Sequence, residues 1–212
     1  MSAPSPEIIL ASASPRRRDL LGQMGVAFEV VTADVEEHDA ESSPHLSPAD
    51  LARENAQRKA AAVAALKPGR WVLGADTVVT LKRRVHRWGD GNAKDRDMEN
   101  RLFGKPASLA QAGNFLRVLS GHTHEVITGC ALIAPDGEAE IFHDVSSVTF
   151  HRLSEETSAR YLAEVNVLDK AGAYALQERG ELIVERVEGS RHNVIGLPTE
   201  ALERVFIRHG LI

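Results

Sequence analysis

The pattern of apolar and polar residues predicts a chain in which strands and helices are intermixed. Short apolar runs are typical of buried strands, and longer stretches with apolar residues three and four apart are typical of helices. Strands are expected at residues 8–11, 26–32, 71–74, 77–81, 124–134, 139–153, 171–176 and 182–187. Helices are expected at residues 15–21, 48–66, 109–119, 154–164 and 199–210. This order favours an α/β fold with a mixed twisted sheet flanked by helices.

The loop after the first strand carries candidate chemistry. Ser14 is a natural N-cap, and Pro15 suits the first position of the helix that follows. The free amides and positive dipole end of that helix, with Arg16 and Arg17 beside them, form an anion-binding site in one interpretation. In the other, this is an ordinary solvated basic turn.

The polar segment at residues 82–102 interrupts the hydrophobic pattern. It is charged, contains glycine and shows little periodicity, which indicates an exposed insertion. No clean linker or internal repeat is evident elsewhere. We therefore expect one domain over residues 1–212 that carries this insertion.

Composition narrows the class of protein. Apolar residues make up 43% of the chain and charged residues 26%, which are ordinary globular values. The net charge of −5 argues against a general nucleic-acid binder. The chain has one cysteine, Cys130, and no apolar run of membrane-spanning length. We expect a cytoplasmic protein with no membrane partner.

Several residues suit metal-dependent attack on a phosphate. Such chemistry needs carboxylates to hold a divalent cation, positive groups for the phosphate oxygens and a base for water. Asp76, expected at a strand end, and Glu37 supply carboxylates. Lys105, between a glycine and a proline, adds positive charge to that of the arginines.

The chain also resembles the Maf family of nucleoside triphosphate pyrophosphatases. The segments that carry the resemblance are residues 11–17, 73–79, 104–106, 119–129, 169–177, 188–190 and 193–198. The resemblance covers nearly the whole chain in the family's order. It implies two lobes with a central cleft, as in inosine triphosphatases, and hydrolysis of a nucleoside triphosphate with Mg²⁺ or Mn²⁺. It is also compatible with a homodimer.

The resemblance also implies roles for individual residues. Asp76 matches the proton acceptor and, with Glu37, a metal ligand; the neighbouring Glu36 is an alternative to Glu37. Positions linked to substrate choice are Arg16, Thr77 and Gln177. Positions that line the phosphate site are Ser12, Arg17 and Lys105, of which Lys105 is also a catalytic candidate.

The neutral amide of Gln177 favours the branch of the family that acts on dTTP and UTP, since an amide can both donate to and accept from a uracil edge. One alternative is 7-methyl-GTP or a broader range of triphosphates. Another is a non-catalytic regulator of cell division.

The chain departs from the family pattern at three places. Asn55 stands where the family normally has lysine, and Lys59, one helical turn further on, is a candidate substitute. Glu178 replaces the usual glycine after Gln177. The segment at residues 82–102 is longer than the usual turn, and is either a lid over the triphosphate or a surface insertion.

Overall fold

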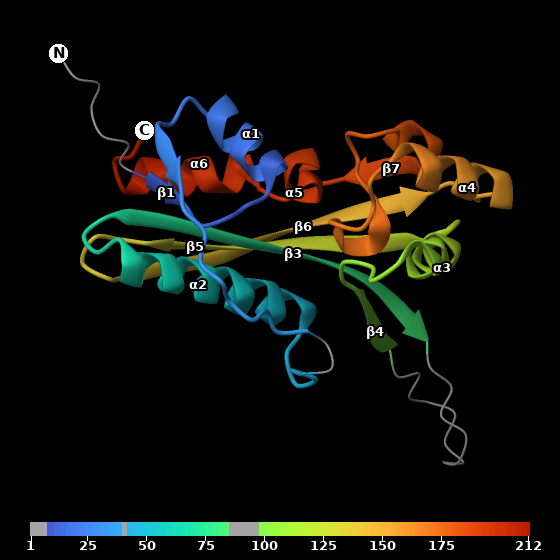
Figure 1. Ribbon diagram of the computed structural model, residues 1–212, viewed down its shortest axis with the longest axis horizontal. Coiled ribbons are helices and arrows are strands. Elements are labelled where there is room, and N and C mark those ends of the chain that lie inside the picture. Colours follow the sequence, from blue (N-terminus) through green and yellow to red (C-terminus); the bar gives the residue numbers. More distant parts are fainter. Residues whose placement is uncertain (1–7, 40–41, 85–97) are drawn as a thin grey trace. The chain divides into compact units, whose positions relative to one another are not determined.

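The computed structural model describes residues 8–39, 42–84 and 98–212 of the chain (Figure 1). The strands are β1 (Ile8–Leu10), β2 (Phe28–Val30), β3 (Trp71–Arg84), β4 (Met98–Phe103), β5 (Thr123–Ile133), β6 (Ala139–Phe150) and β7 (Val184–Glu188). The helices are α1 (Pro15–Gln23), α2 (Pro48–Leu66), α3 (Leu109–Leu119), α4 (Glu155–Glu164), α5 (Arg191–Ile195) and α6 (Thr199–Arg208). Two short 3₁₀ turns, η1 (Ala171–Ala173) and η2 (Gly180–Leu182), complete the described part of the chain.

The described strands form one mixed sheet in the order β2-β1-β3-β5-β6-β7, with β4 paired to β3. β1 runs parallel to both β2 and β3, so that Ile8 lies opposite Phe28 and Trp71. β4 runs antiparallel to β3, with Val79 opposite Phe103. The prediction of a mixed α/β fold is confirmed.

The chain divides into two compact units. The first unit comprises Met1–Val78, Val126–Ser146 and Val187–Ile212, and the second comprises Val79–Glu125 and Ser147–Arg186. The long strands β3, β5 and β6 contribute residues to both.

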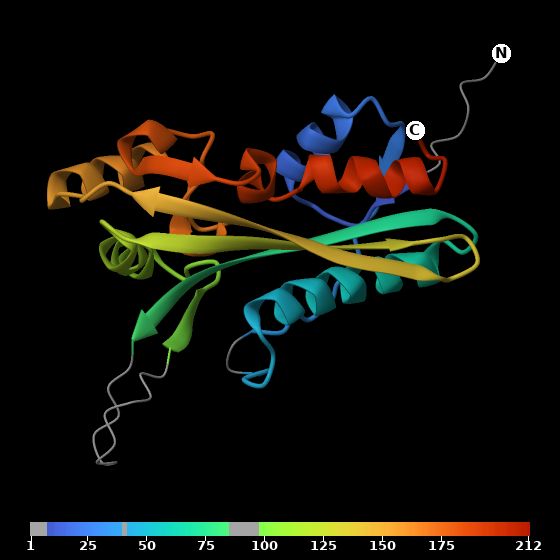
Figure 2. The ribbon, with the colours of Figure 1, turned by 180° about the vertical axis from the view of Figure 1, so that it is seen from behind.

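Alternation along the strands of the first unit gives it two apolar layers. Ile8 and Leu10 of β1 pack with residues of α1 and α6, whereas Ile9 packs with residues of α2. Figures 1 and 2 accordingly show α1 and α6 on one face of the sheet and α2 on the other. Because side chains of a strand point alternately to opposite faces, this three-residue strand supports both layers.

Two glycines let α2 lie against the backbone of the sheet. A Cβ on Gly74 of β3 would lie 2.2 Å from the carbonyl oxygen of Ala56. A Cβ on Gly129 of β5 would lie 2.4 Å from the carbonyl carbon of Ala52. Both distances are too short for any side chain, so glycine is required for this packing.

The second unit is organised around aromatic contacts and a tight turn. α3 packs against α4 and η1, and the ring of Phe103 meets that of Phe115 edge to face at 5.2 Å. The turn at η1 has Gly172 at φ +72°, and its N–H donates to the carbonyl of Gly104 at 3.1 Å. This bond ties the loop after β4 to η1.

Three expectations need correction. The predicted strand at residues 171–176 is wrong, because the positive φ of Gly172 turns the backbone into η1. Asp76 lies inside β3 rather than at its end, because the strand continues to Arg84. The ends of the predicted insertion belong to β3 and β4, where Lys82 pairs with Asn100; residues 85–97 lie outside the described part of the chain.

Candidate active site

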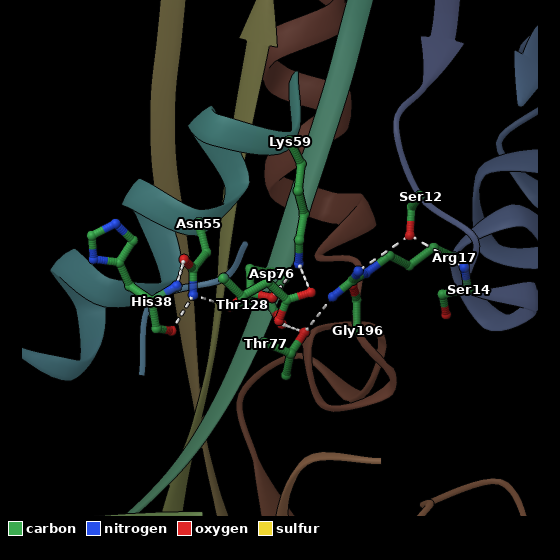
Figure 3. Close-up of polar contacts among 11 residues, drawn as sticks. Ser12, Ser14, Arg17, His38, Asn55, Lys59, Asp76, Thr77, Thr128 and Gly196 are labelled. Atoms are coloured by element: carbon green, nitrogen blue, oxygen red, sulfur yellow. Dashed lines mark hydrogen bonds and ion pairs between the residues drawn. The ribbon is translucent and has the colours of Figure 1, made fainter. Parts of the chain in front are cut away.

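The N-terminus of α1 begins where the sequence predicts. Ser14 is the N-cap and Pro15 the first helical residue, but the Ser14 side chain makes no capping hydrogen bond. Arg18 lies on the exposed side, 3.6 Å from Asp19. Arg17 instead turns toward β3, as Figure 3 shows.

Arg17 is held by three neutral oxygens. Its Nε donates to the carbonyl of Gly196 at 2.8 Å, Nη1 to the Ser12 hydroxyl at 3.2 Å and Nη2 to the Thr77 hydroxyl at 3.0 Å. Burial lowers the pKa of the guanidinium, and the negative charge of Asp76 opposes that shift. Arginine stays protonated in proteins, so the site contains a fixed positive charge whose hydrogen bonds to these oxygens do not neutralise it.

The Thr77 hydroxyl belongs to a chain of hydrogen bonds with a defined direction. The Thr128 hydroxyl, 3.0 Å from that of Thr77, is also 2.9 Å from the carbonyl of Asn193. A carbonyl can only accept, so Thr128 donates to Asn193 and Thr77 must donate to Thr128. With its proton used in this way, Thr77 accepts from Arg17 and fixes the guanidinium in place.

The Ser12 hydroxyl keeps its proton for another acceptor. Its oxygen accepts from Arg17 and, at 3.3 Å, from the N–H of Ser14. A hydroxyl has one proton, and neither bond uses it. Ser12 can therefore donate to an anion beside Arg17.

A lysine bridges the two predicted metal-binding carboxylates. The Lys59 Nζ lies 2.6 Å from Asp76 Oδ1 and 2.9 Å from Glu37 Oε1 (Figure 3 shows the contact with Asp76). The side chains of Lys59 and Asp76 are only 15% and 10% exposed. The carboxylates, far apart in the sequence, thus converge on one cation.

Asn55, one turn before Lys59 on α2, contacts the other oxygen of Asp76. Its Nδ2 lies 3.3 Å from Asp76 Oδ2 and 2.9 Å from the carbonyl of His38. Its Oδ1 accepts from the N–H of His38 at 2.8 Å. Asn55 therefore joins Asp76 to the loop that carries Glu37, and Asn55 and Lys59 together contact both oxygens of Asp76.

The donor set suits a hard divalent cation. Mg²⁺ is commonly bound by one or two carboxylates together with substrate phosphates and water, and Glu37 and Asp76 form such a pair. Within residues 8–39, 42–84 and 98–212, no group of three or more histidine, cysteine or acidic side chains is arranged to hold a metal. Glu37 and Asp76 would by themselves supply only part of the coordination of such an ion.

The remaining predicted residues are Arg16, Lys105 and Gln177. Arg16 is half-buried on the first turn of α1. Lys105 and Gln177 belong to the second unit, where both are exposed. Gln177 precedes Glu178, whose Oε1 lies 3.3 Å from the buried ammonium of Lys170.

Sequence reasoning missed the contribution of Asn193. Its side chain is fully buried and accepts from the N–H of Thr128 at 3.1 Å. Its Nδ2 donates to the Val126 carbonyl and to the Ser146 hydroxyl, both at 2.9 Å. A polar residue inside a family segment was the available signal, but its partners come from distant strands.

The chain matches known proteins over nearly its whole length. The family model described as "Maf-like protein" matches residues 7–209. A "dTTP/UTP pyrophosphatase" of Bacillus cereus is 42% identical over 93% of this chain and 87% of that protein, and one of Bacillus anthracis is 41% identical over 93% of each. The Ham1 protein of Staphylococcus aureus, 16% identical, has the same fold, with a TM-score of 0.50 over 96% of this chain and 98% of that one. None of the helices in the described residues has the length and apolar character needed to cross a membrane.

Proposed function

Because the chain belongs to the Maf family, we propose that it hydrolyses dTTP and UTP to the nucleoside monophosphate and pyrophosphate. The choice of nucleotides rests on the names of the Bacillus relatives and on Gln177. The observation that carries the chemistry is the carboxylate pair of Glu37 and Asp76, with Arg17 hydrogen-bonded to the residue next to Asp76.

In the proposed reaction, water attacks the α-phosphorus and the bond from that atom to the bridging oxygen breaks. Asp76 takes the proton of the attacking water, since each carboxylate oxygen has further lone pairs beyond those used by Asn55 and Lys59. Pyrophosphate leaves with the bridging oxygen. Ser12, Arg17 and the amides at the start of α1 bind phosphate oxygens and stabilise their charge.

Glu37 and Asp76 would hold Mg²⁺ or Mn²⁺, with the substrate phosphates completing the coordination. When bound, such an ion supplies positive charge that stabilises the phosphates and the leaving pyrophosphate. The protein's own part is to keep the two carboxylates close together. Asn55 contributes to this through its bonds to Asp76 and to His38, the residue after Glu37.

Roles for the other predicted residues rest on their positions in the family segments. We assign Lys105 to the phosphates, and Arg16 and Gln177 to the choice of base. Thr77 contributes to that choice indirectly in this proposal, because its hydroxyl is engaged with Arg17 and Thr128. We also place the enzyme in the cytoplasm, in keeping with its single, buried cysteine Cys130.

The test is release of pyrophosphate from a panel of nucleoside triphosphates with Mg²⁺ or Mn²⁺. The panel includes dTTP, UTP, the purine triphosphates and 7-methyl-GTP. Fastest release from dTTP and UTP supports the proposal. Preference for 7-methyl-GTP, release of single phosphate or no turnover of any nucleotide would contradict it.

A further inference from the structure

Lys59 occupies the position between the two carboxylates that the proposed function assigns to a metal. Its Nζ contacts Asp76 Oδ1 at 2.6 Å and Glu37 Oε1 at 2.9 Å. We infer that Lys59 is a resident counter-cation that competes with the divalent metal for this carboxylate pair, so that the protein alone binds the metal weakly. The inference rests on the proposed function only for the nucleotide that accompanies the metal.

Competition follows from the contacts. A divalent cation held between Glu37 and Asp76 would lie in the space that the ammonium occupies, beside the oxygen of each carboxylate that it contacts. A lysine that stayed in place would also put a positive charge within a few ångströms of the metal, on the side of the largely buried Asp76. Repulsion between charges is stronger in such surroundings than in bulk water. The metal can therefore take both carboxylates only if the ammonium moves away.

Among the described residues, the ion pairs of Lys59 are those with Glu37 and Asp76. Its neighbour on α2, Asn55, contacts Asp76 through a neutral amide, and the amide's three hydrogen bonds do not involve Lys59. Lys59 has a flexible four-carbon stem, so its ammonium can turn to another anion when one arrives. A triphosphate supplies that anion, and its binding would release the carboxylates to the metal.

This arrangement couples the metal to the nucleotide. Without nucleotide, Lys59 satisfies the carboxylates. With nucleotide, the phosphates provide negative charge for both the ammonium and the metal. The metal is then expected to bind tightly only when the triphosphate is present.

The test is a titration of the full-length, nucleotide-free protein with Mn²⁺, followed by the electron paramagnetic resonance signal of the free ion. Lys59→Met and Lys59→Gln both remove the charge, and Gln can keep a hydrogen bond to Asp76. Each is expected to bind Mn²⁺ at least about tenfold more tightly than the wild type. Lys67→Met is the matched control, because Lys67 lies just after α2 and pairs with Glu29 at 3.2 Å; it should bind like the wild type.

A Lys59→Gln protein that is folded by circular dichroism and binds Mn²⁺ no more tightly than the wild type overturns the inference. The inference is also overturned if Lys67→Met binds Mn²⁺ as tightly as Lys59→Gln does. The effect would then come from the overall charge of the protein. The titration needs no turnover. If the Lys59 variants bind Mn²⁺ more tightly but the wild type hydrolyses no nucleotide, the proposed function is rejected and the inference stands. If the wild type releases pyrophosphate normally but the Lys59 variants bind Mn²⁺ as it does, the inference is rejected and the proposed function stands.

A second titration tests the coupling. α,β-Methylene-UTP cannot release pyrophosphate, because its α,β-bridge is carbon. In the wild type it should strengthen Mn²⁺ binding by a larger factor than in Lys59→Gln, in which the competing charge is already gone. Equal factors in the two proteins would contradict the role given to Lys59.

Discussion

The side chain of Asn55 binds the backbone of His38 at two points, accepting from its N–H at 2.8 Å and donating to its carbonyl at 2.9 Å. The same amide donates to Asp76 at 3.3 Å. Since His38 follows Glu37 directly, one side chain of α2 positions both proposed metal ligands. The asparagine that departs from the family pattern therefore has a structural role, while Lys59 supplies the positive charge beside Asp76.

Asn55→Ala is expected to weaken the attachment of the loop at Glu37. The change removes three hydrogen bonds and leaves the backbone groups of His38 without this partner, which should cost about 2 kcal/mol of unfolding free energy. The rate of pyrophosphate release should fall by about tenfold or more, because Glu37 is no longer held. Urea unfolding and steady-state kinetics measure the two effects. Gln57→Ala, at an exposed site on the same helix, should change neither, and an active, stable Asn55→Ala protein would refute this role.

Asp76→Asn tests the proposed base. The amide has nearly the same shape but is a far weaker proton acceptor, so the turnover number should fall by about 10²–10⁴-fold. Pyrophosphate release under saturating nucleotide and Mg²⁺ gives this number. Asp34→Asn, an exposed residue near Glu37, serves as the control for loss of a carboxylate. Near-normal turnover of Asp76→Asn would rule out the proposed role.

Thr77→Val tests whether the hydroxyl chain positions Arg17. Valine keeps the shape but loses the bonds to Arg17 and Thr128, so unfolding free energy should fall by about 1–2 kcal/mol and KM for the nucleotide should rise several-fold. Thr77→Ser retains the hydroxyl, so its unfolding free energy and its KM should both lie close to those of the wild type. Comparison of KM and kcat for the two variants measures the effect; if Val and Ser behave alike, the hydroxyl is not the determinant.

The buried His124 should make the protein less stable in acid. Burial lowers the pKa of its imidazole from 6.5 to about 4, and its Nε2 lies 2.9 Å from the Tyr174 hydroxyl. Above pH 6.5 the ring is neutral in both the folded and the unfolded chain. As pH falls toward 4 the unfolded chain takes up a proton that the folded chain does not, which lowers the unfolding free energy by up to about 3 kcal/mol.

Urea unfolding between pH 7 and pH 4 measures this loss. Between pH 7 and pH 4, His124→Gln should lose less unfolding free energy than the wild type, by most of those roughly 3 kcal/mol. His122 is exposed and lies two residues before His124, so His122→Gln should lose stability in acid as the wild type does. An unchanged pH dependence in His124→Gln would assign the acid sensitivity to other groups.

Local signals in the sequence predicted the helix starts well. Ser47, Ser108 and Ser154 each accept a hydrogen bond from the N–H three residues on, because a cap depends only on neighbouring residues. The apolar run at η1 was misleading, since apolar content does not reveal that Gly172 and Ala173 both adopt positive φ. An apolar run says that a segment is buried, but not which backbone conformation it has.

The candidate site was predictable in part. The spacing of Asn55 and Lys59 places both on one face of a helix, and that inference needs no tertiary structure. That the same face meets Asp76 and Glu37 depends on how α2 packs on β3. The bonds from Asn193 to Thr128 and Val126 likewise join segments more than sixty residues apart, and no periodicity in the sequence indicates them.

The close packing of α2 on Gly74 and Gly129 has a consequence for engineering this protein. Replacing glycine by alanine is a common way to stabilise a protein, because it restricts the unfolded chain. Here an added methyl group would push away the helix that carries Asn55 and Lys59, and both side chains would lose reach to Asp76. These two positions should be kept as glycine in any stabilised variant, since the close approach of α2 to β3 and β5 is what brings Asn55 and Lys59 to Asp76.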